Sequence, residues 1–234
     1  MVARIDPTAP RKKYALLKWS RKWNVRNPGR MVAAPHGFNP ESPHIGKPAR
    51  EFVRAMQRAT GLKVTGQFDE ATMRHLLPPG IRGVVMAKAH AELGEHEWPP
   101  NSNNGPIVEY LHAVGISGGQ PWCAAFVTWD LKECGFKHFP VNPAYAPSWL
   151  EFARHHGLLK PLDRSLPGDL WLWNWDGGLI DHIGFCDEGV KGATAYYLDG
   201  NVGAYGGSVT DAARPAGGIA DVIDLVKLHN LKAA

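Results

Sequence analysis

The chain has 234 residues, of which 44% are hydrophobic and 21% charged, and its formal net charge is +4. These values are typical of a folded globular protein and exclude the fibrous and intrinsically disordered classes. No apolar run approaches the roughly 20 residues needed to cross a bilayer. The three cysteines include no metal-type pair, which argues against a disulfide framework or a zinc finger.

The first residues carry charge but no continuous apolar segment, so we expect no secretory signal peptide. An odd number of cysteines without a disulfide pattern indicates synthesis in a reducing cytoplasm. If the protein acts on a target outside that cytoplasm, we expect another factor to release it.

Charge is distributed unevenly along the chain. Residues 1–83 contain 16 Lys and Arg against 5 Asp and Glu, a balance of +11, whereas the rest contains 10 and 17, a balance of −7. A basic part followed by an acidic part indicates that the first binds a polyanion and the second has another role. Nucleic acid and the anionic wall of a bacterium are both candidate polyanions, and simple solubilisation is the alternative.

The sequence of residues 1–80 predicts a small domain of three helices. The basic, aromatic stretch at 12–23 has the spacing of an amphipathic helix, and packing in a bundle is favoured over contact with a membrane or nucleic acid. After a loop, a second helix ends at Gly61 and a turn follows at Gly66. The third helix has an acidic start, which suits the positive end of the helix dipole. The Pro- and Gly-rich residues 76–83 predict a linker.

The segment VRAMQRATGLKVTGQFDEATMRHLL resembles the type 1 peptidoglycan-binding domain of bacterial wall hydrolases and matrix metalloproteinase propeptides. That family has a helix containing Gln, a Gly-Leu-x-Val-x-Gly turn, then Phe or Leu, an acidic residue and Thr. The matching positions are Gln57, Gly61, Leu62, Val64, Gly66, Phe68, Asp69 and Thr72. No cysteine follows in a metalloproteinase-type switch, which excludes that branch. The resemblance implies binding to peptidoglycan; a folding cap is the alternative.

The segment GGQPWCAAFVTWDLKECGF places a cysteine at the start of a predicted helix. Apolar residues repeat at helical spacing from Cys123 until Gly135. The N–H groups and the positive partial charge at a helix start lower the pKa of a thiol and favour the thiolate nucleophile. A buried, inert residue is the alternative for Cys123 and the interpretation that we favour for Cys134.

Two predicted strands supply a candidate base and a group to orient it. The strand IDHIGFCDEG has His182 near its start, and the strand TAYYLDGNVG ends in Asp199 and Asn201. In an antiparallel sheet these side chains are expected to be neighbours. Facing the start of the Cys123 helix, they would reproduce the arrangement of papain-like enzymes.

Four motifs of the predicted second domain, residues 84–234, resemble the CHAP domain (cysteine, histidine-dependent amidohydrolase/peptidase) in order and spacing: PWCAAFVTW, PGDLWLW, DHIGF and YYLDGN. This domain is common in bacteriophage endolysins and bacterial wall hydrolases. The resemblance implies an α+β, papain-like fold with helices packed on an antiparallel sheet, Cys123 as nucleophile and His182 as general base and acid. The family's acidic residue, usually Glu, corresponds to Asp199 and its following Asn to Asn201. The shorter Asp leaves open which of the two holds the imidazole.

The implied reaction is acyl transfer. The thiolate attacks an amide carbonyl of peptidoglycan, N–H groups at the helix start stabilise the oxyanion, and His182 protonates the leaving amine before water hydrolyses the thioester. The motifs fit equally well a muramoyl-L-alanine amide and a peptide bond of the stem or cross-bridge. Trp122, Trp173 and Trp175 are expected either to line a groove for glycan or stem peptide or to pack in the core.

No cofactor or metal is expected. The stretch HAVGISGGQ before the cysteine lacks the aspartates of the calcium loop that some CHAP domains carry. His155, His156, His182 and Cys186 lack the spacing of a zinc site, so zinc-dependent hydrolysis is a weak third option. We therefore predict a monomeric peptidoglycan hydrolase of the endolysin type, with no nucleic-acid partner and no stable membrane insertion. The alternative is a non-hydrolytic wall-binding or virion protein with a degenerate catalytic domain.

Overall fold

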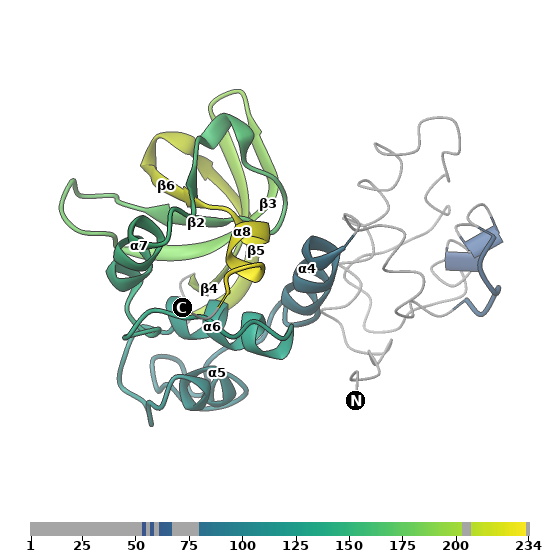
Figure 1. Cartoon of the computed structure of the whole chain (residues 1–234). Coiled ribbons are helices and arrows are strands. Elements are labelled where there is room, and N and C mark those ends of the chain that lie inside the picture. The colour runs from purple at the N-terminus through teal and green to yellow at the C-terminus, as the bar shows by residue number, and fades with distance from the viewer. Residues whose placement is uncertain (1–52, 55–56, 59–60, 67–79, 203–206, 233–234) are drawn as a thin grey trace. The chain divides into compact units, whose positions relative to one another are not determined.

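The chain divides into two compact units, Met1–Pro79 and Gly80–Ala234 (Figure 1). The computed structural model describes residues 53–54, 57–58, 61–66, 80–202 and 207–232. The helix predicted at 12–23 and the third helix predicted after Gly66 lie outside these residues.

In the first unit, the described residues include the end of a helix. The backbone N–H of Leu62 donates to Gln57 O at 2.9 Å, and that of Gly61 donates to Arg58 O at 3.3 Å. This pair of hydrogen bonds defines a Schellman helix end, whose penultimate residue takes a left-handed conformation. Gly61 has a φ of 73°, which a glycine adopts without steric cost.

The turn after this helix is fixed by one buried side chain. The Gln57 carboxamide oxygen accepts hydrogen bonds from the backbone N–H groups of Thr65 and Gly66, at 2.9 Å each. Its amide nitrogen also donates to Thr65 Oγ1 at 3.0 Å. Gly66 has a φ of 70°, so the predicted turn is present at this position. The structure thus explains three residues of the sequence pattern: Gln57 holds the turn, and Gly61 and Gly66 adopt the positive φ that the turn requires.

The described part of the second unit is α+β and contains five α-helices and six strands. The helices are α4 (Ile81–Ala91), α5 (Val108–Ala113), α6 (Cys123–Glu133), α7 (Ala146–His155) and α8 (Leu225–His229). The strands are β1 (Leu159–Lys160), β2 (Leu170–Trp173), β3 (His182–Lys191), β4 (Thr194–Val202), β5 (Ser208–Pro215) and β6 (Ile219–Ile223).

All six strands form one antiparallel sheet in the order β1-β6-β2-β3-β4-β5. The two strands predicted from sequence, β3 and β4, are adjacent in it. In the β3–β4 pair, Phe185 lies opposite Leu198. Continuing this register places Gly184 opposite Asp199, so the end of β4 lies beside the beginning of β3.

Helix α6 packs on β3 and β4 and lies between the sheet and α5 (Figure 1). Its residues from Cys123 to Leu131 are all buried, which is the pattern of a central helix rather than a surface one. The ring of Phe126 meets that of Phe185 edge-on, with centroids 6.1 Å apart. On the α5 side, Tyr110 packs against Phe126 with centroids 5.2 Å apart.

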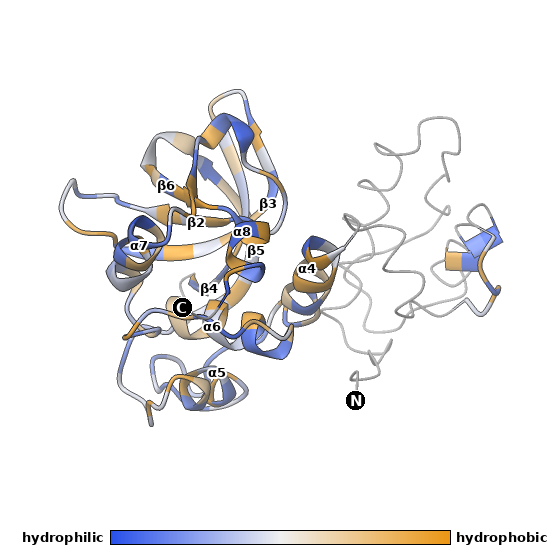
Figure 2. Cartoon of the chain, in the orientation of Figure 1, coloured by the Kyte–Doolittle hydropathy of each residue, from blue (hydrophilic) through white to orange (hydrophobic). Residues whose placement is uncertain are grey.

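The opposite face of the sheet is also covered. A second cluster of buried residues gathers there: Trp171, Trp173, Cys186, Ala195, Tyr197 and Val222. Strand β2 is therefore buried at all four positions, which explains its continuous apolar sequence LWLW. In Figure 2 both the strands and helix α4 carry hydrophobic and hydrophilic residues.

One predicted boundary needs correction, and two strands lie outside the predicted elements. The predicted linker at 76–83 extends too far, because α4 begins at Ile81 and buries Val85 and Met86 soon after Gly80. Strands β5 and β6 are not among the predicted elements, since apolar and polar residues alternate only weakly in SVTDAARP and IADVI. Among the described residues, no helix is long and apolar enough to span a membrane.

A buried carboxylate in α6 makes stability depend on pH. Asp130 is fully buried, and neither of its oxygens has a hydrogen-bond partner in the described part of the chain. Burial raises the pKa of Asp130 well above its ordinary value of 3.8, and nearby Lys88 only partly opposes this. The folded protein therefore holds this proton more tightly than the unfolded chain does.

This contribution to stability is fully present below pH 3.8 and is lost as the pH rises toward the folded-state pKa. We therefore expect Asp130→Asn to raise the melting temperature by a few degrees at pH 8 and by less at pH 4. Thermal unfolding followed by circular dichroism measures both values. The exposed Asp163, changed to Asn, is the control. A gain that is the same at both pH values would contradict the prediction.

Candidate active site

Cys123 is the first residue of helix α6, and Trp122 is its N-cap. No side chain caps this helix start, so its first N–H groups remain available to a negatively charged atom. The Cys123 side chain is mostly buried, with 5% of its surface exposed. The predicted position of the thiol on the first turn of a helix is thus observed.

His182 begins strand β3, and Asp199 lies near the end of β4. Their side chains are hydrogen bonded, with His182 Nε2 2.8 Å from Asp199 Oδ2. Both are buried. Because Nε2 is occupied by Asp199, Nδ1 is the ring nitrogen left for Cys123, whose charge and hydrogen bonding raise the pKa of His182. Three residues that are distant in sequence thus form one chain of contacts.

The electrostatics of the thiol and the imidazole are coupled. Burial raises the pKa of Cys123, but the charge of His182 and hydrogen bonds from His182, Ile183 N–H and Ala124 N–H outweigh it, so the pKa is lowered. Burial lowers the pKa of His182, but the charges of Cys123 and Asp199 and its hydrogen bonds to them raise it to about 10. These shifts favour the thiolate and the imidazolium over the neutral thiol and imidazole. Such a pair can attack an electrophilic carbon and return a proton to a leaving group.

The other two cysteines have the opposite character. Burial raises the pKa of Cys134, and the charge of Asp130 adds to this effect. Burial also raises the pKa of Cys186, to about 12. Cys123 is therefore the thiol of this chain whose surroundings favour the nucleophilic form.

Two glycines allow the close approach of β3, β4 and α6. A Cβ on Gly184 would overlap the Oδ1 atom of Asp199, so the carboxylate lies directly over this glycine. A Cβ on Gly200 would come within 2.6 Å of the Trp122 ring and 2.8 Å of Phe126 Cβ. The residue after Asp199 thus contacts the residue before Cys123.

Asn201 occupies a different place. Its φ is 62°, and its Oδ1 atom lies beside Gly207, where an added Cβ would be 2.5 Å away. The His182 imidazole is instead hydrogen bonded to the Asp199 carboxylate, with Nε2 2.8 Å from Oδ2. Of the two candidates for holding the imidazole, the geometry therefore favours Asp199.

The three tryptophans expected either to line a groove or to pack in the core differ in exposure. Trp122 and Trp173 have no exposed surface and do not line a groove, because Trp122 packs against Tyr110 and Trp173 belongs to the second cluster of buried residues. Trp175 remains 54% exposed. It stacks on His182 with ring centroids 5.3 Å apart and ring planes 27° apart.

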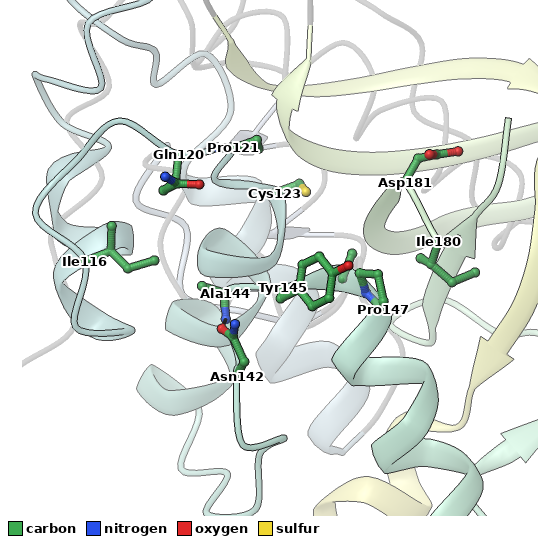
Figure 3. A pocket seen from close by; sticks show the side chains of 11 residues that line it. Ile116, Gln120, Pro121, Cys123, Asn142, Ala144, Tyr145, Pro147, Ile180 and Asp181 are labelled. Atoms are coloured by element: carbon green, nitrogen blue, oxygen red, sulfur yellow. Dashed lines mark hydrogen bonds between the residues drawn. The ribbon is translucent and has the colours of Figure 1, made fainter. Parts of the chain in front are cut away.

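A pocket of about 420 Å³ borders the thiol (Figure 3). In Figure 3, Cys123 lies between Gln120 on one side and Ile180 and Asp181 on the other. The polar residues Asn142 and Tyr145 come from the segment before α7, where no sequence motif identified them. The other lining residues are Ile116, Pro121, Ala144, Ala146 and Pro147. In the described part of the chain, no group of three or more His, Cys, Asp or Glu could hold a metal ion.

Residues 36–76 match a family described as a putative peptidoglycan binding domain. The chain carries a peptidoglycan-binding domain. The match includes the pattern from Gln57 to Thr72, so the resemblance predicted for this segment is confirmed. No curated protein matches the chain. The match supports peptidoglycan as a partner and suggests a function associated with the cell wall.

The overlap at Gly184 predicts the effect of one added methyl group. Gly184→Ala forces the Asp199 carboxylate or strand β4 to move, so the hydrogen bond to His182 is lost or lengthened. Because that bond and charge raise the pKa of His182, the pKa should fall, as measured by NMR titration of the imidazole. Overpacking should also cost about 1–3 kcal/mol of stability.

Gly217 is the matched control, because a Cβ there would meet nothing within 4 Å. Gly217→Ala should leave both the His182 titration and the stability unchanged. A Gly184→Ala protein that keeps the wild-type titration of His182 would show that the carboxylate tolerates displacement.

Proposed function

We propose that the chain is a peptidoglycan hydrolase whose second unit cleaves an amide or peptide bond by a thiol mechanism. The observation that carries this proposal is the contact chain from Cys123 through His182 to Asp199 at the start of helix α6. A helix that begins with a nucleophile and packs on an antiparallel sheet carrying its base is the arrangement that a papain-like CHAP domain requires. The peptidoglycan-binding domain supplies the substrate class.

The proposed reaction begins when the Cys123 thiolate attacks the carbonyl carbon of the scissile bond. The negative charge that develops on the oxygen is stabilised by N–H groups at the start of α6, with Gln120 in the pocket wall as a further candidate donor. The His182 imidazolium gives its Nδ1 proton to the leaving amine, and a thioester remains. Asp199 orients the ring and stabilises its positive charge.

Water then hydrolyses the thioester. The neutral His182 removes a proton from the water, the resulting hydroxide attacks the thioester carbonyl, and the carboxylic acid product leaves as Cys123 returns to the thiolate. His182 is again an imidazolium, so the cycle restores the starting ion pair. Each proton in the two steps passes through the same ring nitrogen, and Asp199 remains a carboxylate throughout.

The division of charge fits a division of roles. An acidic second part is repelled by an anionic wall, so a basic, wall-binding first part would raise its local concentration at the substrate. An activity of this kind is that of a bacteriophage endolysin, which the motifs of the second unit resemble. We propose that the protein is made in the cytoplasm and acts on the wall after release.

The first test of this function removes the nucleophile. Cys123→Ala should lower the rate of wall hydrolysis by roughly 10⁴-fold or more, because nucleophile and base act as a unit. Loss of turbidity of a purified wall suspension measures the rate, and mass spectrometry of the fragments identifies the bond. Cys134→Ser is the matched control and should keep most of the activity. A Cys123→Ala protein that still clears the suspension would overturn the thiol mechanism.

The second test separates Asp199 from Asn201 through the pH profile. The charge of Asp199 helps to raise the pKa of His182 to about 10, so wild-type activity should decline only above that pH. Asp199→Asn should shift this alkaline limb to lower pH, because a neutral amide stabilises the imidazolium less, and should lower kcat by about 10²-fold. Asn201→Ala should leave the limb in place. The reverse ranking of the two variants would give the orienting role to Asn201.

A further inference from the structure

A buried carboxylate beside the site is not used by the proposed mechanism. Glu97 is 2% exposed, and its backbone N–H donates to Gly207 O at 3.3 Å. Its side chain accepts hydrogen bonds from Trp122 Nε1 at 2.7 Å, from Asn103 N at 3.0 Å and from Asn103 Nδ2 at 3.3 Å. A carboxylate without water is stable only when N–H donors or a cation surround it. Here three N–H donors do so.

The strongest of these contacts leads to the nucleophile. Trp122 immediately precedes Cys123 and is the N-cap of α6. Its fully buried indole lies between Glu97 on one side and Gly200 on the other, where a Cβ would approach the ring to 2.6 Å. Gly200 immediately follows Asp199. The indole thus lies between the start of α6, which carries the Cys123 thiol, and the end of β4, which carries the Asp199 carboxylate.

We propose that Glu97 is a positioning residue, which holds the Trp122 indole against Gly200 and so sets the separation of Cys123 from the His182–Asp199 pair. Without the hydrogen bond, the indole is free to rotate out of this contact, and the start of α6 loses its fixed spacing from β4. The consequence for hydrolysis rests on the proposed function. The expected effect on the reactivity of the Cys123 thiol is independent of that function.

The chemistry of the contact explains why a carboxylate is suited to this position. Glu97 Oε1 accepts from both Trp122 Nε1 and Asn103 Nδ2, and Oε2 accepts from Asn103 N. A carboxylate offers two acceptor oxygens and no donor, whereas a carboxamide would turn a donor toward one of these N–H groups. A negative charge is also stabilised near the start of a helix.

The alternative to positioning is that Glu97 only anchors the segment around Asn103. Asn103 has a φ of 51°, so glycine replaces it without backbone strain and removes only its side-chain bond to Glu97. Trp122→Phe instead keeps an aromatic ring and removes only the indole N–H. These two variants therefore divide the contacts of Glu97 into the part that anchors the loop and the part that reaches the nucleophile.

The experiment measures the rate of Cys123 alkylation by iodoacetamide as a function of pH, followed by peptide mass spectrometry so that Cys134 and Cys186 do not interfere. We expect Trp122→Phe and Glu97→Ala to slow alkylation about tenfold at pH 6, because the loosened ion pair raises the pKa of the thiol. The double variant that combines Glu97→Ala with Trp122→Phe should be alkylated no more slowly than Glu97→Ala, and Asn103→Gly should be alkylated at the wild-type rate. Wall hydrolysis should show a kcat lowered roughly 10- to 100-fold with KM unchanged.

Wild-type alkylation profiles in folded Trp122→Phe and Glu97→Ala proteins would overturn the positioning role. A slowing in Asn103→Gly equal to that in Trp122→Phe would also overturn it, in favour of loop anchoring. Should Glu97→Ala not fold, Glu97→Gln and Trp122→Phe provide the same comparison. A wild-type protein that shows the expected alkylation pattern but hydrolyses no wall would leave the positioning role intact and reject the proposed function instead.

Discussion

A carboxylate and an imidazole that are both removed from water stabilise each other only as a pair, and the His182–Asp199 hydrogen bond is that pair here. Its formation requires the end of β4 to lie against the beginning of β3 with no side chain between them. Gly184 meets this requirement by leaving the space that the Asp199 carboxylate fills. The charge state of Cys123 then follows from the pair, because the imidazolium lowers the pKa of the thiol against the effect of burial.

The layers of the second unit explain how the thiol reaches the imidazole. Helix α6 is buried along most of its length between α5 and the sheet, so its direction and depth are fixed by aromatic contacts such as that between Phe126 and Phe185. Its first residue emerges at the edge of this packing, beside a pocket. A rigid helix thus presents one reactive atom at one opening, while the rest of the helix contributes to the core.

Much of this arrangement could be predicted from the sequence, because local periodicity and turn residues determine the start of α6 and the strands β3 and β4. The complete burial of Trp122 and Trp173 could not be predicted, because a short strand or helix that is buried on both sides can have the same local sequence pattern as one buried on a single side. The pocket residues Asn142 and Tyr145 also escaped prediction. They reach the thiol only through the tertiary fold, and no motif marks them. For Asp199 and Asn201, the choice depended on strand register, which single residues do not reveal.

The ion pair at Cys123 has a chemical cost. The thiolate, which this environment favours, is also the form that peroxides oxidise, first to a sulfenic acid and then to irreversible products. Cys134 and Cys186, whose pKa values are raised by burial, are far less susceptible in the same medium. The near-complete burial of Cys123 limits access, but the pocket beside it is large enough for a small oxidant. The working lifetime of the thiol in an aerated medium is therefore tied to the supply of reductant around it.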